Sequence, residues 1–254
     1  MMDVRHEGAR AAEEARAADQ RTMDAAESAG MAREEMMALL AGRSATYGLL
    51  SRLYLEEIDQ ELLDELHGRL YPVETGDARM DRGYLALATF LSNLWAESVS
   101  ELKVDYARCF LGHGVDGFSA AYPYESVYTS PKRLMMQKAR DEVLALFAGQ
   151  GIARTEAWKE GEDHVALELE FQRILGDRAI EAVREGDRRR ARRLLVTQQA
   201  FLRDHLLNWT PMLTADMRLR AQTKLYQGLA DLTDGFLAVD EGFLDDMLPL
   251  LDGE

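Results

Sequence analysis

Apolar side chains recur at steps of three and four residues from about residue 34 onward, the spacing that gathers them on one face of a helix. The first such stripe comprises Met36, Leu39, Leu40, Tyr47, Leu50, Leu53 and Tyr54. A shorter helix follows Asp59, whose carboxylate is placed to cap it. We find no stretch in which apolar and polar residues alternate in the manner of a half-buried strand. The pattern predicts an all-α fold.

Similar stripes predict further helices, which short polar breaks separate. They are expected over residues 84–95, 98–110, 134–147, 163–185, 188–207, 214–233 and 240–250. Ser130 and Pro131 supply a cap and a first-turn proline for the helix at 134–147. Asp163 is placed to cap the helix that begins beside it. The sequence thus predicts a helical bundle of about ten helices.

A polar stretch at 150–161 that contains glycine divides the helical pattern in two and is interpreted as a hinge. It joins an N-terminal helical part, residues 34–149, to a C-terminal helical part, residues 162–254. Residues 1–33 differ from both, with nine alanines before Ala32, seven acids and almost nothing large enough to pack. A helix without a buried face gains little stability, so a disordered or marginally helical tail is expected. The alternative is an extra helix that packs on a neighbouring molecule.

The chain is acidic, with a net charge of -15 from 30 Lys and Arg against 45 Asp and Glu. This charge makes nucleic acid an unfavourable partner and a basic ligand a favourable one. Six arginines over 184–193 are interpreted as a solvated helix start. The single Cys109 excludes an internal disulfide and a cysteine-based zinc site. The longest uncharged stretch, 83–96, is too short to span a bilayer. The N-terminus lacks the apolar core of a secretory signal. We therefore expect a soluble cytoplasmic protein without stable membrane insertion.

The sequence carries no local motif of an enzyme or of a cofactor site. It has no phosphate-binding loop, no dinucleotide-binding glycine pattern and no nucleophile elbow. It also lacks the Glu-x-x-His pattern of di-iron bundles and the paired histidines of zinc proteases. We therefore predict no enzymatic activity and no bound cofactor.

Three stretches carry more polar and aromatic groups than a plain bundle needs: 105–112, the tyrosine-rich 122–128, and 160–164. Each leaves two interpretations open. Tyr106 and Phe110 are either ordinary core or an apolar wall, and the tyrosine-rich loop either crosses the bundle or recognises a peptide. His164 and Glu168 form either a structural hydrogen bond or a polar contact beside a groove, and a glutamate one turn away would raise the pKa of the histidine.

These stretches resemble the TorD/DmsD family of molybdoenzyme-specific chaperones, the redox enzyme maturation proteins. Glu160-Gly161-Glu162-Asp163-His164 is similar to the Glu-Pro-x-Asp-His pattern of the family. Residues 105–112 resemble its Tyr-x-x-Leu-Phe-x-Gly-Pro stretch, and 124–130 and 201–211 also match in order and spacing. Gly161 stands in place of the motif proline, and Cys109 in place of a leucine.

The resemblance implies an all-helical chaperone that binds the twin-arginine signal peptide and the folded body of a molybdopterin-dependent oxidoreductase precursor until its cofactor is inserted. The family includes monomers and domain-swapped dimers, and the hinge would be the place to swap. A leader that joins a guanidinium pair to an apolar segment needs carboxylates beside an apolar groove. The expected contacts are Glu125, Tyr128, Glu160, Asp163, His164, Glu168 and His205, with Tyr106, Phe110 and Trp209 as the apolar wall.

Two other functions stay open at this point. One is a structural adaptor subunit of an oxidoreductase complex, for which the same helical fold would serve. The other is a nucleotide hydrolase that uses His164 with Glu168 or Asp163 as acid and base.

Overall fold

The computed structural model describes residues 4–69, 71–72, 74–112, 120–153, 155, 158 and 160–252, and the side chains among them from Gly30 onward. These residues form helices, and their one β feature is an isolated antiparallel bridge between Tyr124 and His164. The predicted all-α fold is confirmed. The elements are α1 (Val4–Leu55), α2 (Gln60–His67), α3 (Ala78–Leu91), α4 (Ser98–Tyr106), η1 (Ala107–Leu111), α5 (Glu125–Thr129), α6 (Lys138–Gly149), α7 (Val165–Arg184), α8 (Arg188–Phe201), η2 (Leu202–Leu206), α9 (Leu207–Arg220) and α10 (Lys224–Leu250), where η marks a short π-helical turn.

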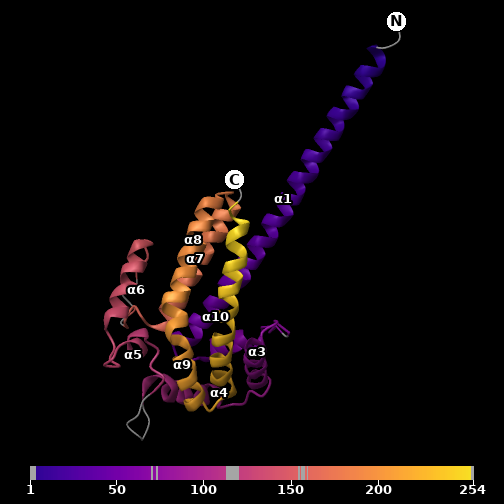
Figure 1. Cartoon of the computed structure of the whole chain (residues 1–254). Coiled ribbons are helices and arrows are strands. Elements are labelled where there is room, and N and C mark those ends of the chain that lie inside the picture. The colour runs from indigo at the N-terminus through magenta and orange to yellow at the C-terminus, as the bar shows by residue number, and fades with distance from the viewer. Residues whose placement is uncertain are drawn as a thin grey trace.

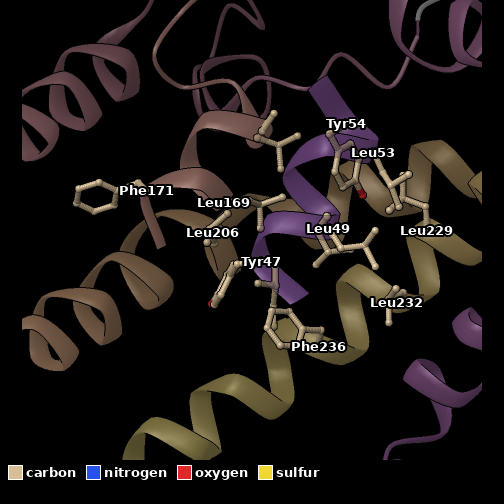
Figure 2. Close-up of a cluster of buried hydrophobic side chains, with 14 of the residues drawn as sticks. Tyr47, Leu49, Leu53, Tyr54, Leu169, Phe171, Leu206, Leu229, Leu232 and Phe236 are labelled. Carbon is tan, nitrogen blue, oxygen red and sulfur yellow. The ribbon is translucent and has the colours of Figure 1, made fainter. Parts of the chain in front are cut away.

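The C-terminal half of α1 is the central helix of the bundle (Figure 1). Tyr47 and Tyr54 are fully buried on it. This part of α1 lies between Leu169 of α7 and Phe236 of α10, and the Tyr47 ring packs against Phe236 (Figure 2). The predicted apolar stripe of this helix is therefore a true core stripe, although Leu39 at its start is half exposed. No helix among the described residues is both long and apolar enough to span a membrane.

A buried polar network fixes α1 against the C-terminal helices. The Arg43 guanidinium donates to Asp240 of α10 and to Gln198 of α8, and the Tyr47 hydroxyl donates to Asp240 Oδ2 at 2.6 Å. Burial and the Asp240 charge raise the pKa of Tyr47 well above its usual value. Because every charged member of this network is paired, it aligns the helices that carry the site without leaving an isolated buried charge.

The last helices are longer than the sequence predicts, since α10 runs unbroken through the expected gap between residues 233 and 240. Its glycines serve packing and do not end the helix. A Cβ on Gly235 would lie 2.6 Å from the Met80 backbone nitrogen, and one on Gly228 would lie 2.8 Å from the Gly83 carbonyl oxygen. These contacts let α10 lie directly against α3. The helix before it, α9, begins at Leu207 and carries Pro211 inside, so the expected start at 214 is wrong.

The helix expected over 134–147 begins instead at Lys138, and Ser130 does not cap it. Arg133 and Met136 have positive φ angles of 50° and 58°, which are incompatible with a continuous helix. The Gln137 backbone N–H donates to the Ser126 hydroxyl at 3.1 Å, so residues 130–137 fold back on α5.

The first helix, α1, runs without a break from Val4 through Gly42, and its N-terminal part projects from the bundle (Figure 1). The expected tail at 1–33 falls largely on this projecting part. Residues 1–3 of the expected tail lie outside the described residues. Residues 154, 156, 157 and 159 of the expected hinge also lie outside them. The tail, the two helical parts and the hinge stay predictions.

Candidate functional site

The tyrosine-rich loop and the 160–164 stretch form a short ladder, although 37 residues separate its central partners. The Glu125 N–H donates to the Asp163 carbonyl at 2.9 Å, and the Val165 N–H donates to the Pro123 carbonyl at 2.8 Å. The Asp163 carboxylate accepts from the Ser126 N–H at 2.9 Å. Asp163 therefore supports the start of α5, and the prediction that it caps α7 is wrong.

His164 is the residue that caps α7, because its Nδ1 accepts from the Ala166 N–H at 3.1 Å. Only 4% of His164 is exposed, and burial lowers the pKa of its imidazole to about 3. A neutral ring suits this role, since a protonated Nδ1 could not accept the bond. The expected rise in its pKa beside Glu168 is wrong, because desolvation outweighs the neighbouring carboxyl. The rings of Tyr124 and Trp158 meet His164 edge to face, with centroids 5.0 and 5.3 Å away.

Behind this ladder lies a buried cluster from α5, α7, η2 and α9. Glu125 Oε2 and His205 Nδ1 lie 2.8 Å apart, and the Trp209 indole N–H donates to Glu168 Oε2 at 3.1 Å. Tyr128 stacks on Trp209, with ring centroids 5.6 Å apart. The π-helical turn η2 contains His205 and changes the direction in which its side chain points from the helix.

Glu168 is fully buried, and its pKa is raised well above the usual value by burial first and by the negative charge of Glu125 second. Burial likewise raises the pKa of Asp163. Three carboxyl groups thus share one interior region, where burial and their mutual repulsion favour the protonated form of Glu168. This cluster holds the loop in place. His164 lies outside this cluster and uses its Nδ1 on the helix cap.

A cavity of about 780 Å³ opens beside the cluster between α5, α6 and η2. Glu125 and His205 line it, together with Glu142 of α6 and Asp204. Lys138, also on the wall, pairs with Glu142 at 2.5 Å. Among the predicted contacts, these two, Glu125 and His205, are the ones that reach this cavity.

A second hollow lies between α1, α7 and the connection that follows α6. Its volume is about 660 Å³, and Leu49 and Leu55 of α1, Phe171 of α7 and Trp158 line it. Glu160 lies beside it, exposed, with its Oε2 accepting from the Tyr124 hydroxyl at 2.6 Å.

Tyr106 and Phe110 lie in the aromatic core, outside the buried cluster. The Tyr106 hydroxyl donates to the Tyr54 carbonyl at 3.2 Å, and both rings pack against Tyr226 of α10. Burial, and then the charges of Glu57, Glu56 and Glu160, raise the pKa of Tyr106 to about 12. The Tyr106 hydroxyl therefore lies near the exposed carboxylates at the end of α1.

Sequence reasoning missed several residues around the two hollows: Glu56, Glu57, Glu142, Trp158 and Asp204. Glu56 and Glu57 directly follow the first apolar stripe, a signal that could have drawn attention to them. Neither hollow has a linear motif, because α1 and α7 come from distant parts of the chain.

Comparison with known proteins identifies one family. The family model described as "Nitrate reductase delta subunit" matches residues 76–215. The chaperone protein TorD of Photobacterium profundum is 28% identical over 217 residues, which are 83% of this chain and 98% of the relative. TorD of a Psychrobacter species is 25% identical over 222 residues, 84% of this chain and 96% of the relative. A crystal structure of a candidate redox enzyme maturation protein from Archaeoglobus fulgidus aligns with a TM-score of 0.42 and 15% identity, over 80% of this chain and 93% of that one.

Proposed function

The chain belongs to the nitrate reductase delta subunit family, the family of the TorD chaperones of molybdoenzyme maturation, and on that premise we propose that it binds the twin-arginine signal peptide of its client. Its relatives are named chaperones, which is a non-enzymatic role. The proposed client is a molybdopterin-dependent oxidoreductase precursor in the cytoplasm. The chaperone holds its leader, and also contacts its folded body, until the cofactor is inserted.

The observation that carries this proposal is the ladder between residues 123–126 and 161–165. At the ladder, exposed Glu160 lies two residues after Trp158, which lines an apolar hollow. A leader that combines two guanidinium groups with an apolar segment matches an apolar surface with carboxylates beside it. Carboxylates accept the planar guanidinium fork better than the ammonium of lysine, so the site would select arginine.

The predicted contact residues divide into two roles under this proposal. Glu160 is exposed and available to the leader. Glu125 and His205 line the acidic cavity but are buried and paired with each other. Asp163, His164, Glu168 and Trp209 are buried and hold the loop and the start of α7. Tyr128, half buried, covers Trp209. The nucleotide hydrolase alternative loses its basis, because His164 is neutral, buried and committed to the helix cap.

Titration calorimetry tests the leader as the ligand. The purified chain is titrated with leaders from the molybdoenzymes encoded in the same genome, and each leader is also made with Lys-Lys in place of its arginine pair. We expect one leader to bind and its Lys-Lys version to bind at least tenfold more weakly.

If no leader bound, while a stoichiometric complex with the mature, cofactor-loaded enzyme persisted, the adaptor function would replace this proposal.

A further inference from the structure

The hollow between α1 and α7 has the form of an apolar groove. Small residues, Ala45 and Gly48 of α1 and Ala166 of α7, lie along it, and larger apolar side chains complete its walls. Phe171 belongs to these walls and lies apart from the α1–α10 contact at Phe236 (Figure 2). From Ala45 to Leu55 the groove follows ten residues of α1, which is about 15 Å at 1.5 Å per residue. That length suits an apolar helical segment of about ten residues, within the 7–15 residues of a typical leader core.

One end of this groove is acidic. Leu55 lines the groove, and the next two residues are the exposed Glu56 and Glu57. Trp158 also lines it, two residues before exposed Glu160. The Tyr106 hydroxyl donates to the Tyr54 carbonyl at 3.2 Å, two residues before Glu56, and the charges of all three carboxylates help to raise the pKa of Tyr106. None of the three forms an ion pair with another described residue. Their charge is therefore available to a cation at this end.

The arginines along the groove already have acidic partners. Arg52 and Arg69 both pair with Glu65, and Arg173 pairs with Glu170 and Asp177. The Arg173 side chain also lies over Gly48, where a Cβ would come within 2.8 Å of it. Arg52 and Arg69 share one carboxylate and so leave one positive charge, against the three negative charges of Glu56, Glu57 and Glu160. This end of the groove is therefore net negative, so a bound chain with a positive end would lie in a single direction.

We propose that this groove holds the apolar segment of the client's leader, with the leader's arginine pair at the Glu56–Glu57–Glu160 end and the following residues running toward Ala45. The inference rests on the proposed function and adds the location and direction of the peptide. In a leader the arginine pair precedes the apolar segment, so the acidic end of the groove receives the N-terminal side of the ligand. The cavity beside Glu142 and Asp204 is the competing location.

A pair of matched double variants of the full chain decides between the two locations. Glu56→Gln with Glu57→Gln removes two exposed charges at the groove end, and Glu142→Gln with Asp204→Asn removes two exposed charges at the cavity. Both are titrated with the Arg-Arg and Lys-Lys leaders. We expect the first variant to bind the Arg-Arg leader at least tenfold more weakly and to lose most of its preference over Lys-Lys. The second variant should match the wild type.

Cross-linking tests the direction. A photo-reactive residue placed next to the arginine pair should attach near Leu55 or Trp158, and one placed ten residues later should attach near Ala45 or Ile174. Loss of binding only in the Glu142→Gln, Asp204→Asn variant, or attachment around that cavity, would overturn the groove while the leader remained the ligand. Failure of the wild type to bind any leader would overturn the proposed function itself.

Discussion

His164 replaces the usual small N-cap residue of a helix with a buried neutral imidazole, and this choice makes the stability of the protein depend on pH. Its pKa is lowered to about 3 in the folded chain by burial, whereas an exposed histidine has a pKa near 6.5. Between these values the unfolded chain binds more protons than the folded chain. The contribution of His164 to stability is therefore intact above pH 6.5 and is lost as the pH falls below it.

His164→Asn tests this dependence, because an asparagine side-chain oxygen can accept the same bond from Ala166 without titrating. Between pH 7 and pH 5 the wild type should lose about 2 kcal/mol more of its free energy of unfolding than the variant. Urea unfolding followed by circular dichroism at both pH values measures the difference. The raised pKa values of Asp163 and Glu168 act equally in both proteins, so equal losses would refute the assignment to His164.

At this scale the sequence grouped Glu125, Glu168, His205 and Trp209, which do lie together, with Tyr106 and Phe110, which do not. It also assigned the helix cap to the wrong residue. Asp163 and His164 both lie where a cap is needed, and a shift of one residue decides between them. Ser126 settles the matter, since its N–H donates to the Asp163 carboxylate across the ladder. That contact depends on how two distant loops meet, which periodicity does not report.

Glycines in helices show, for whole elements, that the sequence does not report contacts between distant parts of the chain. Gly42 lies within the first apolar stripe, and Gly83 directly precedes the stripe at 84–95; neither position in the sequence shows how closely another helix approaches. In the structure Gly42 is exposed on α1, and a Cβ there meets nothing within 4 Å. Gly83 lies on α3, where a Cβ would come within 2.6 Å of the Leu232 backbone nitrogen on α10. The sequence of a single segment is enough to predict a helix. The contact between α3 and α10 depends on the sequences of both helices and on how they meet.

The two glycines should therefore respond to alanine in opposite directions. Gly42→Ala should stabilise the fold by about 1 kcal/mol, because alanine is the better helix former and nothing obstructs its methyl group. Gly83→Ala should destabilise it by about 1–3 kcal/mol, because the backbones of α3 and α10 must move apart. Thermal unfolding of the two variants beside the wild type measures both shifts. A stable Gly83→Ala variant would show that α3 and α10 do not pack this closely.

For the whole molecule, the helical periodicity predicted the all-α fold. The spaced motifs indicated the family, because the order and spacing of several pieces are rarely met by chance. The groove was not predictable in this way. Its walls come from α1, α7 and Trp158, and no local pattern marks residues that meet only after folding.

The net charge of -15 also acts at the scale of the whole molecule, since a negative surface attracts a basic leader over distances beyond direct contact. Salt shortens that range, from a screening length of about 30 Å at 0.01 M to about 8 Å at 0.15 M. The association rate of the leader, measured by stopped-flow fluorescence, should fall roughly tenfold between about 10 and 300 mM NaCl.

The Lys-Lys leader separates this long-range attraction from recognition at the site. It carries the same charge, so its association rate should show the same dependence on salt, while its dissociation should be faster because the ammonium groups cannot form paired bonds with carboxylates. An association rate that ignored salt would show that the acidic surface faces away from the leader's approach. A dissociation rate equal for both leaders would show that the site detects charge alone.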